Sequence, residues 1–257
     1  MKSIYFERRQ NVGHIVLANP PSNLIAADFA DSLEKAVREA SRADIRSLLI
    51  RAEGPNFSHG GDILDFIDKG LDDWRTFISQ MHYTYRSIEA LQIPTISAVR
   101  GAALGGAFEL ALACDFIVAA ENATFRCIEA SVGTAPVAGG VQRLAEKAGR
   151  AYAARYVMLS EPMSGTTAGQ LGVGEDQVEK VAGDLAIKLA NGPTRSYGAI
   201  RALLKAWSSG GVAGADALTL DLTMGLHTTE DARKGRTARA EAVIRGEEPA
   251  PVVFLGK

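Results

Sequence analysis

Short apolar strands and amphipathic helices alternate over the first half of the chain, and helices fill the second half. From residue 139 onward the pattern is almost wholly helical, with breaks at Gly165, Gly172, 192–193 and 208–211. This order predicts an α/β core followed by a helical C-terminal region. The segments that resemble strands are 4–8, 14–17, 47–52, 95–99, 116–120 and 124–126, and those that resemble helices are 26–43, 72–91 and 109–114.

Composition and charge argue against a nucleic-acid or membrane partner. Of the 257 residues, 47% are hydrophobic and 23% are charged, which is usual for a globular protein with a sizeable core. The formal net charge is −2, and the basic residues form no stripe, so we expect no nucleic-acid partner. Cys114 and Cys127 form no C-x-x-C pair, which indicates neither a disulfide scaffold nor a metal site. The longest apolar stretch, 110–120, is too short to span a bilayer, so we expect a cytoplasmic protein without a membrane partner.

The first chemical motif is a run of small residues, 101–106, that ends in Gly105-Gly106 and is followed by Glu109. We interpret it as a turn between a strand and a short helix. Paired glycines allow a ligand close to the backbone, and a helix start offers free N–H donors. Glu109, one turn further on, would share that cavity. The same sequence is also consistent with a tight turn that is packed for steric reasons, with Glu109 exposed to solvent.

The second motif follows the buried strand 47–52. Gly60-Gly61 could present another backbone N–H beside Asp62, with Phe57 anchoring the loop in the core. Taken alone, this motif is better explained as an ordinary glycine-rich loop.

The third motif places Glu129 in an apolar stretch before a loop that contains Pro136 and Gly139-Gly140. A carboxylate in an apolar pocket acquires a raised pKa, which suits acid–base work. The alternative is that Glu129 is a cap or a surface residue.

Taken in their order along the chain, the three motifs resemble the crotonase superfamily, which contains enoyl-CoA hydratases and isomerases. The resemblance rests on Phe-x-x-Gly-x-Asp-Ile from Phe57, Gly-x-x-Leu-Gly-Gly-x-x-Glu from Gly101, and Glu-x-x-x-Gly-x-x-Pro-x-x-Gly-Gly from Glu129. It implies a spiral of ββα units over 1–190 and a helical trimerisation region over 191–257. It also implies a homotrimer or a dimer of trimers, and a lyase of fatty acid metabolism.

The resemblance further implies the roles of individual residues. Gly61 and Gly106 would supply the oxyanion hole, and the segment from Gly61 through Asp62, Ile63 and Leu64 would run along the substrate's coenzyme A. Glu109 would hold the attacking water, and Glu129 would supply the Cα proton. No metal and no separate cofactor are implied, because coenzyme A is part of the acyl-CoA substrate.

The chain departs from the family pattern at three places. Arg126-Cys127-Ile128 stands where relatives have Gly-x-Pro, and Pro136-Val137 stands where many hydratases have Pro-Gly. After 171–173 the chain is shorter than usual, and we expect the customary strand to be missing. The acyl pocket would then suit a group other than a straight chain. The alternatives on this scaffold are a double-bond isomerase, a C–C hydrolase of cyclic ketones, a decarboxylase, and a non-catalytic acyl-CoA-binding protein.

Overall fold

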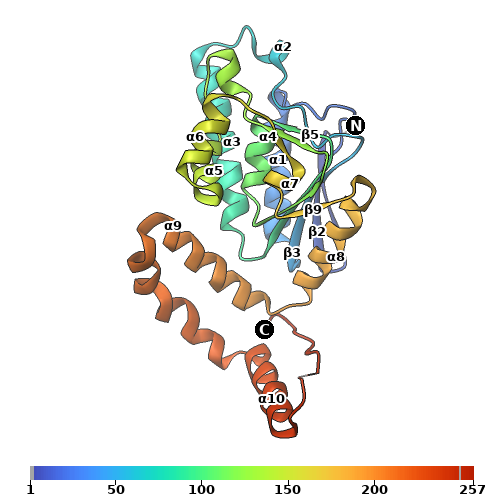
Figure 1. The fold of residues 1–257 in the computed structure, drawn as a ribbon, viewed down its shortest axis with the longest axis vertical. Helices are drawn as coiled ribbons and strands as arrows, with labels where there is room; N and C mark the ends of the chain where they lie inside the picture. The colour runs from blue at the N-terminus through green and yellow to red at the C-terminus, as the bar shows by residue number, and fades with distance from the viewer. Residues whose placement is uncertain (1–2, 249) are drawn as a thin grey trace.

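The computed structural model describes residues 3–248 and 250–257, and its core is a six-stranded sheet with helices packed against it (Figure 1). The strand order is β1-β2-β3-β4-β6-β9, in which β1 is antiparallel to β2 and the other neighbours are parallel. The strands are β1 (Ile4–Arg9), β2 (Val12–Leu17), β3 (Ser47–Ala52), β4 (Thr95–Val99), β6 (Phe116–Ala120) and β9 (Leu171–Val173). Every residue of β2 and β4 is buried, so both faces of the sheet are covered.

Helices with apolar stripes bury this sheet. In α1 the stripe of Phe29, Leu33 and Val37 is buried, as the sequence pattern predicts. This helix packs on β1, β2 and α3, whereas α8 packs on β2, β3, β4 and β6. The helices of the core are α1 (Ala27–Arg42), α2 (Ile63–Phe66), α3 (Leu71–Ala90), α4 (Gly106–Leu112), η1 (Glu129–Val132), α5 (Gly140–Ala148), α6 (Arg150–Met158), α7 (Gly165–Ala168), η2 (Glu175–Gln177) and α8 (Val178–Ala190).

A second, three-stranded sheet corrects the interpretation of 101–106 as a turn. Ala102–Leu104 forms strand β5, which pairs in parallel with β7 (Thr124–Arg126). Met163–Ser164 forms β8, antiparallel to β7. The strand at 102–104 escapes sequence analysis because its small residues carry no alternation, and pairing with β7 decides its conformation.

Two further expectations are wrong in detail. The short helix starts at Gly106 rather than at 109, because Gly105, with φ 53°, already makes the turn. Leu171–Val173 forms strand β9 at the edge of the main sheet beside β6, where the sequence pattern predicts only helices and breaks, and it is followed by η2 and α8. The second half of the chain therefore contains two short strands besides its helices.

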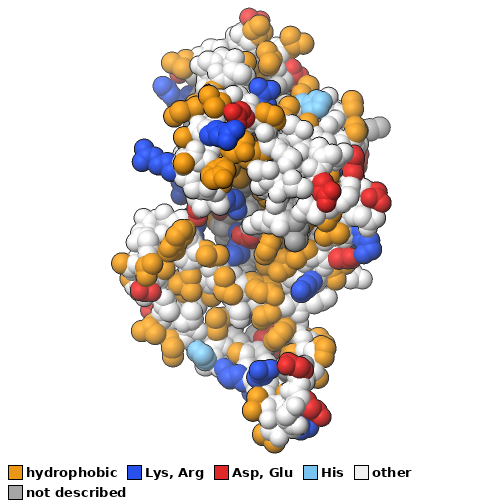
Figure 2. Space-filling model, in the orientation of Figure 1, with side chains coloured by type: hydrophobic (Ala, Val, Ile, Leu, Met, Phe, Trp, Pro, Cys, Tyr) orange, Lys and Arg blue, Asp and Glu red, His pale blue; other side chains and the backbone are white. Residues whose placement is uncertain are grey.

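The C-terminal helices extend away from the sheet in Figure 1. They are α9 (Thr194–Thr223), η3 (Met224–Thr228) and α10 (Glu230–Arg245). The predicted break at 208–211 is confirmed, since Gly211 has φ 63° and kinks α9. Figure 2 shows hydrophobic side chains gathered over these helices, and Leu220 is 68% exposed. Among the residues described, no helix combines the length and apolar character needed to cross a bilayer.

Candidate active site

Backbone hydrogen bonds hold two of the glycine motifs side by side. The Ser58 N–H donates to the Ala102 carbonyl at 2.8 Å, and the Leu104 N–H donates to the Ser58 carbonyl at 3.1 Å. Gly60 has φ 84°, and a Cβ there would lie 2.6 Å from the Leu104 carbonyl oxygen. Only glycine allows this approach of two backbones. The contact places Gly61 in the same region as the start of α4.

Gly61 and Gly106 each carry a backbone N–H group that makes no backbone hydrogen bond to the residues that the structure describes. The bonds around Gly61 belong to its neighbours: Ile25 donates to the Gly60 carbonyl, and Asp62 donates to the Ile25 carbonyl. Gly106 is the first residue of α4, where a helix leaves its N–H without an internal partner. Within residues 3–248 and 250–257, neither N–H makes a backbone hydrogen bond. Both donors are therefore available to an acceptor outside the chain.

Glu109 is buried on α4 and is held by the backbone of the third motif. Its Oε1 accepts hydrogen bonds from the N–H groups of Ala138 at 2.9 Å and Gly140 at 2.7 Å. Burial raises the pKa of Glu109 to about 7. The hydrogen bond from the Gly140 N–H lowers this pKa, and the negative charge of Glu129 raises it. The exposed alternative considered for Glu109 is wrong, because its exposure is 1%.

Glu129 begins η1 and lies on the other side of the glycine pair. A Cβ at Gly105 would be 3.1 Å from Oε1 of Glu129, and one at Gly106 would be 3.9 Å from Oε2 of Glu109. Oε2 of Glu129 is buried and has no hydrogen-bond partner in the part of the chain that the structure describes. Burial raises the pKa of Glu129. The two carboxylates thus flank the glycines at the start of α4.

The side chains beyond Gly61 have other surroundings. Asp62 caps α2, and its Oδ1 accepts from the Leu64 N–H at 3.1 Å. Ile63 is 64% exposed and Leu64 is 85% exposed, so both lie on the surface next to the glycine motif. Their contact with a substrate stays a prediction.

Several residues of the site escape sequence analysis. Tyr85 is fully buried on α3, and its hydroxyl donates to the Gly106 carbonyl at 2.8 Å. Burial raises the pKa of Tyr85 well above its ordinary value, so the hydroxyl remains a donor. In the sequence Tyr85 sits between Met81 and Ile88 on one apolar stripe, and only its hydroxyl signals that it needs a buried partner. Cys127 is also buried near both glutamates, and burial raises the pKa of its thiol to about 12.

Two departures from the family pattern leave the carboxylates in place. Val137 is 41% exposed, and the next residue, Ala138, still donates its N–H to Glu109. The Cys127 thiol stays neutral, so it adds no charge to the site. The described residues contain no group of three or more His, Cys, Asp or Glu side chains placed to hold a metal ion.

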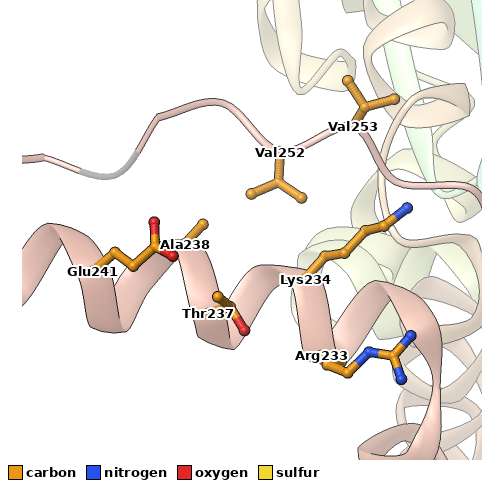
Figure 3. Close-up of a pocket in the computed structure, with 7 residues that line it drawn as sticks. All are labelled: Arg233, Lys234, Thr237, Ala238, Glu241, Val252 and Val253. Carbon is orange, nitrogen blue, oxygen red and sulfur yellow. The ribbon is translucent and has the colours of Figure 1, made fainter.

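A separate groove lies between α10 and the segment that carries Val252 and Val253 (Figure 3). Its volume is about 500 Å³, and Arg233, Lys234 and Glu241 line it. None of the predicted site residues borders this groove.

Comparison with known proteins identifies the family of this chain. The family model described as enoyl-CoA hydratase/isomerase matches residues 7–243. A Bacillus subtilis protein named probable enoyl-CoA hydratase is 33% identical over 212 residues, which are 79% of this chain and 82% of the relative. The 2,3-dehydroadipyl-CoA hydratase of Escherichia coli is 32% identical over 181 residues, 68% of this chain and 69% of the relative.

A solved structure supports the fold. The crystal structure of an enoyl-CoA hydratase from a Polaromonas species superposes with a TM-score of 0.86 at 26% identity, covering 96% of this chain and 98% of that one. The crotonase-like fold expected from the sequence is thereby confirmed. The chain belongs to the enoyl-CoA hydratase/isomerase family, within the crotonase superfamily.

Proposed function

We propose that the protein adds water across the α,β double bond of an enoyl-CoA thioester. The observation that carries this proposal is the placement of two carboxylates, the buried Glu109 and the half-buried Glu129, beside Gly105-Gly106 at the start of α4. Hydration needs a group that takes a proton from water and a group that gives a proton to Cα. An enzyme using a single base would not require a second carboxylate in this position.

The free N–H groups of Gly61 and Gly106 would stabilise the negative charge that develops on the thioester oxygen. The N–H of Gly106 also lies at the positive end of α4, which favours an anion. In other oxyanion holes one such donor contributes about 2.7–4 kcal/mol to the transition state. The segment Gly61–Leu64 would then lie along the coenzyme A part of the substrate.

The surroundings of the two carboxylates suggest their roles. Glu109 is fixed through Oε1 by two N–H groups, which favours an oriented, ionised carboxylate that binds water through Oε2 and takes its proton. Glu129 has a buried Oε2 without a described partner, and burial favours its protonated form, which can give the proton to Cα. The hydroxide oxygen bonds to Cβ, and a proton must pass from Glu109 to Glu129 before the next turnover.

The test is a panel of enoyl-CoA thioesters that differ in chain length, branching and terminal carboxylate. Loss of the conjugated absorbance together with a mass gain of one water supports hydration. A shifted double bond at unchanged mass would mean an isomerase, and loss of carbon dioxide would mean a decarboxylase. Turnover of no thioester in the panel would refute the proposal.

A further inference from the structure

Glu109 is held by a tight turn, residues 138–140, that is itself held from behind by an ion pair. The turn gives two N–H groups to Glu109, and a Cβ at Gly140 would lie only 2.8 Å from Glu109 Cγ. The glutamate side chain therefore rests directly on this turn. Any change in the turn moves the carboxylate.

Arg143 of α5 occupies the other side of the same turn. It is 7% exposed and donates from Nη1 to the Ala138 carbonyl. Gly139 has φ 97°, and a Cβ there would lie 2.2 Å from Nη1 of Arg143. The guanidinium thus fills the space that a side chain at 139 would need, and it fixes the residue whose N–H binds Glu109.

Glu89 of α3 clamps Arg143 with two parallel hydrogen bonds. Nε donates to Oε1 at 2.7 Å, and Nη2 donates to Oε2 at 2.9 Å. Burial by itself would raise the pKa of Glu89, but the bonds and charge of Arg143, with the charge of Lys205, lower it below its ordinary value. The clamp is therefore an ionised pair.

The position of Arg143 is unfavourable for its own helix. It lies in the first turn of α5, where the helix dipole disfavours a cation. A buried ion pair is also weak evidence for stability. Where a sequence breaks a local rule in this way, a role at a functional site is the usual reason.

We infer that Arg143, clamped by Glu89, is a positioning residue that fixes the 138–140 turn and thereby the orientation of Glu109. This inference rests on the proposed function for its kinetic readout. The charged and titratable groups around Glu109 are Tyr85 on α3, Cys127 after β7, Glu129 on η1 and Arg143 on α5. Arg143 is the cation of this set, and its charge favours the ionised form of Glu109.

The main experiment compares Arg143→Gln and Arg143→Lys with the full-length wild type. A small displacement of a catalytic group costs on the order of 10²-fold in rate, so we expect Arg143→Gln to lose about that much kcat with KM little changed. Its acidic limb in the pH–rate profile should move to higher pH, because a charge that favours ionised Glu109 is gone. Arg143→Lys keeps the positive charge but loses the two parallel hydrogen bonds of the guanidinium. The acidic limb of its pH–rate profile should therefore stay nearer the wild-type position.

Arg51→Gln is the matched control. Arg51 also forms a partly buried pair with a carboxylate, 3.1 Å from Glu7, with side-chain exposures of 15% and 31%. It lies on β3, away from the 138–140 turn. This variant also loses a partly buried ion pair, but its pH–rate profile should match the wild type.

A second readout needs no turnover. Hydrogen exchange of the peptide covering 134–144 should become faster in Arg143→Gln and unchanged in Arg51→Gln. If wild type hydrates no thioester, the proposed function fails while this measurement still decides the positioning role. Should Arg143→Gln not fold, Glu89→Gln replaces it, because glutamine keeps the shape of the side chain and one oxygen that accepts from Arg143. The pH–rate profile and the hydrogen exchange of 134–144 are then measured on that variant. Unchanged exchange and an unshifted limb in the folded variant would overturn the inference.

Discussion

Replacing Gly140 by alanine tests the close contact between this glycine and Glu109. The new Cβ would lie 2.8 Å from Glu109 Cγ, 3.0 Å from its Oε1 and 3.3 Å from its Cδ. Ordinary contacts begin at about 3.4 Å, so Glu109 must retreat by about 0.6 Å. This moves the carboxylate away from the two N–H groups that orient it.

The change should separate activity from stability. Gly140 is the first residue of α5, where alanine gains less over glycine than the ~0.5–1 kcal/mol of a helix interior, so little of the strain is offset. A displacement approaching 1 Å costs up to about 10²-fold in rate, so we expect a loss of kcat between 10-fold and 10²-fold. The assay is steady-state hydration of the best thioester, with thermal unfolding measured in parallel.

Gly183→Ala is the control for this prediction. Gly183 also lies in a helix, α8, and a Cβ there meets nothing within 4 Å. It should raise stability by about 0.5–1 kcal/mol and leave kcat unchanged. Full activity of a folded Gly140→Ala protein would refute the idea that the position of Glu109 limits the reaction.

Other predictions address the same site and the assembly. Glu109→Gln and Glu129→Gln should each lower kcat by about 10² or more while coenzyme A ester binding persists, as measured by calorimetry; wild-type turnover would remove that residue from the mechanism. The pKa of Glu109 is raised from 4.5 to about 7, so its ionisation costs the folded state up to about 3 kcal/mol as pH rises through that window. Glu109→Gln should therefore have a larger free energy of unfolding than wild type at pH 8 but not at pH 4. The same difference in free energy of unfolding at both pH values would contradict the raised pKa. Gly106→Pro removes one of the two proposed oxyanion donors at a helix position that tolerates proline. A folded variant, checked by circular dichroism, should therefore lose about 10²–10³-fold in kcat, and Ala should cost less. Light scattering should give a trimer or hexamer, and a monomer at micromolar concentration would contradict the assembly role of 191–257.

The sequence contains enough to predict the alternation of elements and to single out the glycines and glutamates of the candidate site. Glycine pairs and an acidic residue in an apolar stretch are local signals, and each depends on backbone chemistry that holds in any context. For this reason Gly106 and Glu109 could be placed together before the structure was known. The position of Gly61 beside this pair could not be predicted, because it depends on the long-range pairing of Ser58 with Ala103.

What sequence analysis missed was decided by tertiary contacts. The strand Ala102–Leu104 exists because β7 lies beside it, and β9 exists because β6 offers a free edge. Tyr85 and Glu89 fall one turn apart on α3, and in the sequence they read as a core aromatic and a solvated charge. Only the fold shows that their partners are Gly106 and Arg143.

The most direct measurement of the central claim follows the fate of solvent atoms. Wild-type enzyme would be incubated with an enoyl-CoA thioester in deuterated water that also carries a heavy oxygen isotope, and the product analysed by mass spectrometry and proton NMR. If Glu109 activates water and Glu129 delivers a solvent-derived proton, the product carries one heavy oxygen at Cβ and one deuterium at Cα. Deuterium incorporation without uptake of heavy oxygen would contradict hydration and assign the site to double-bond migration.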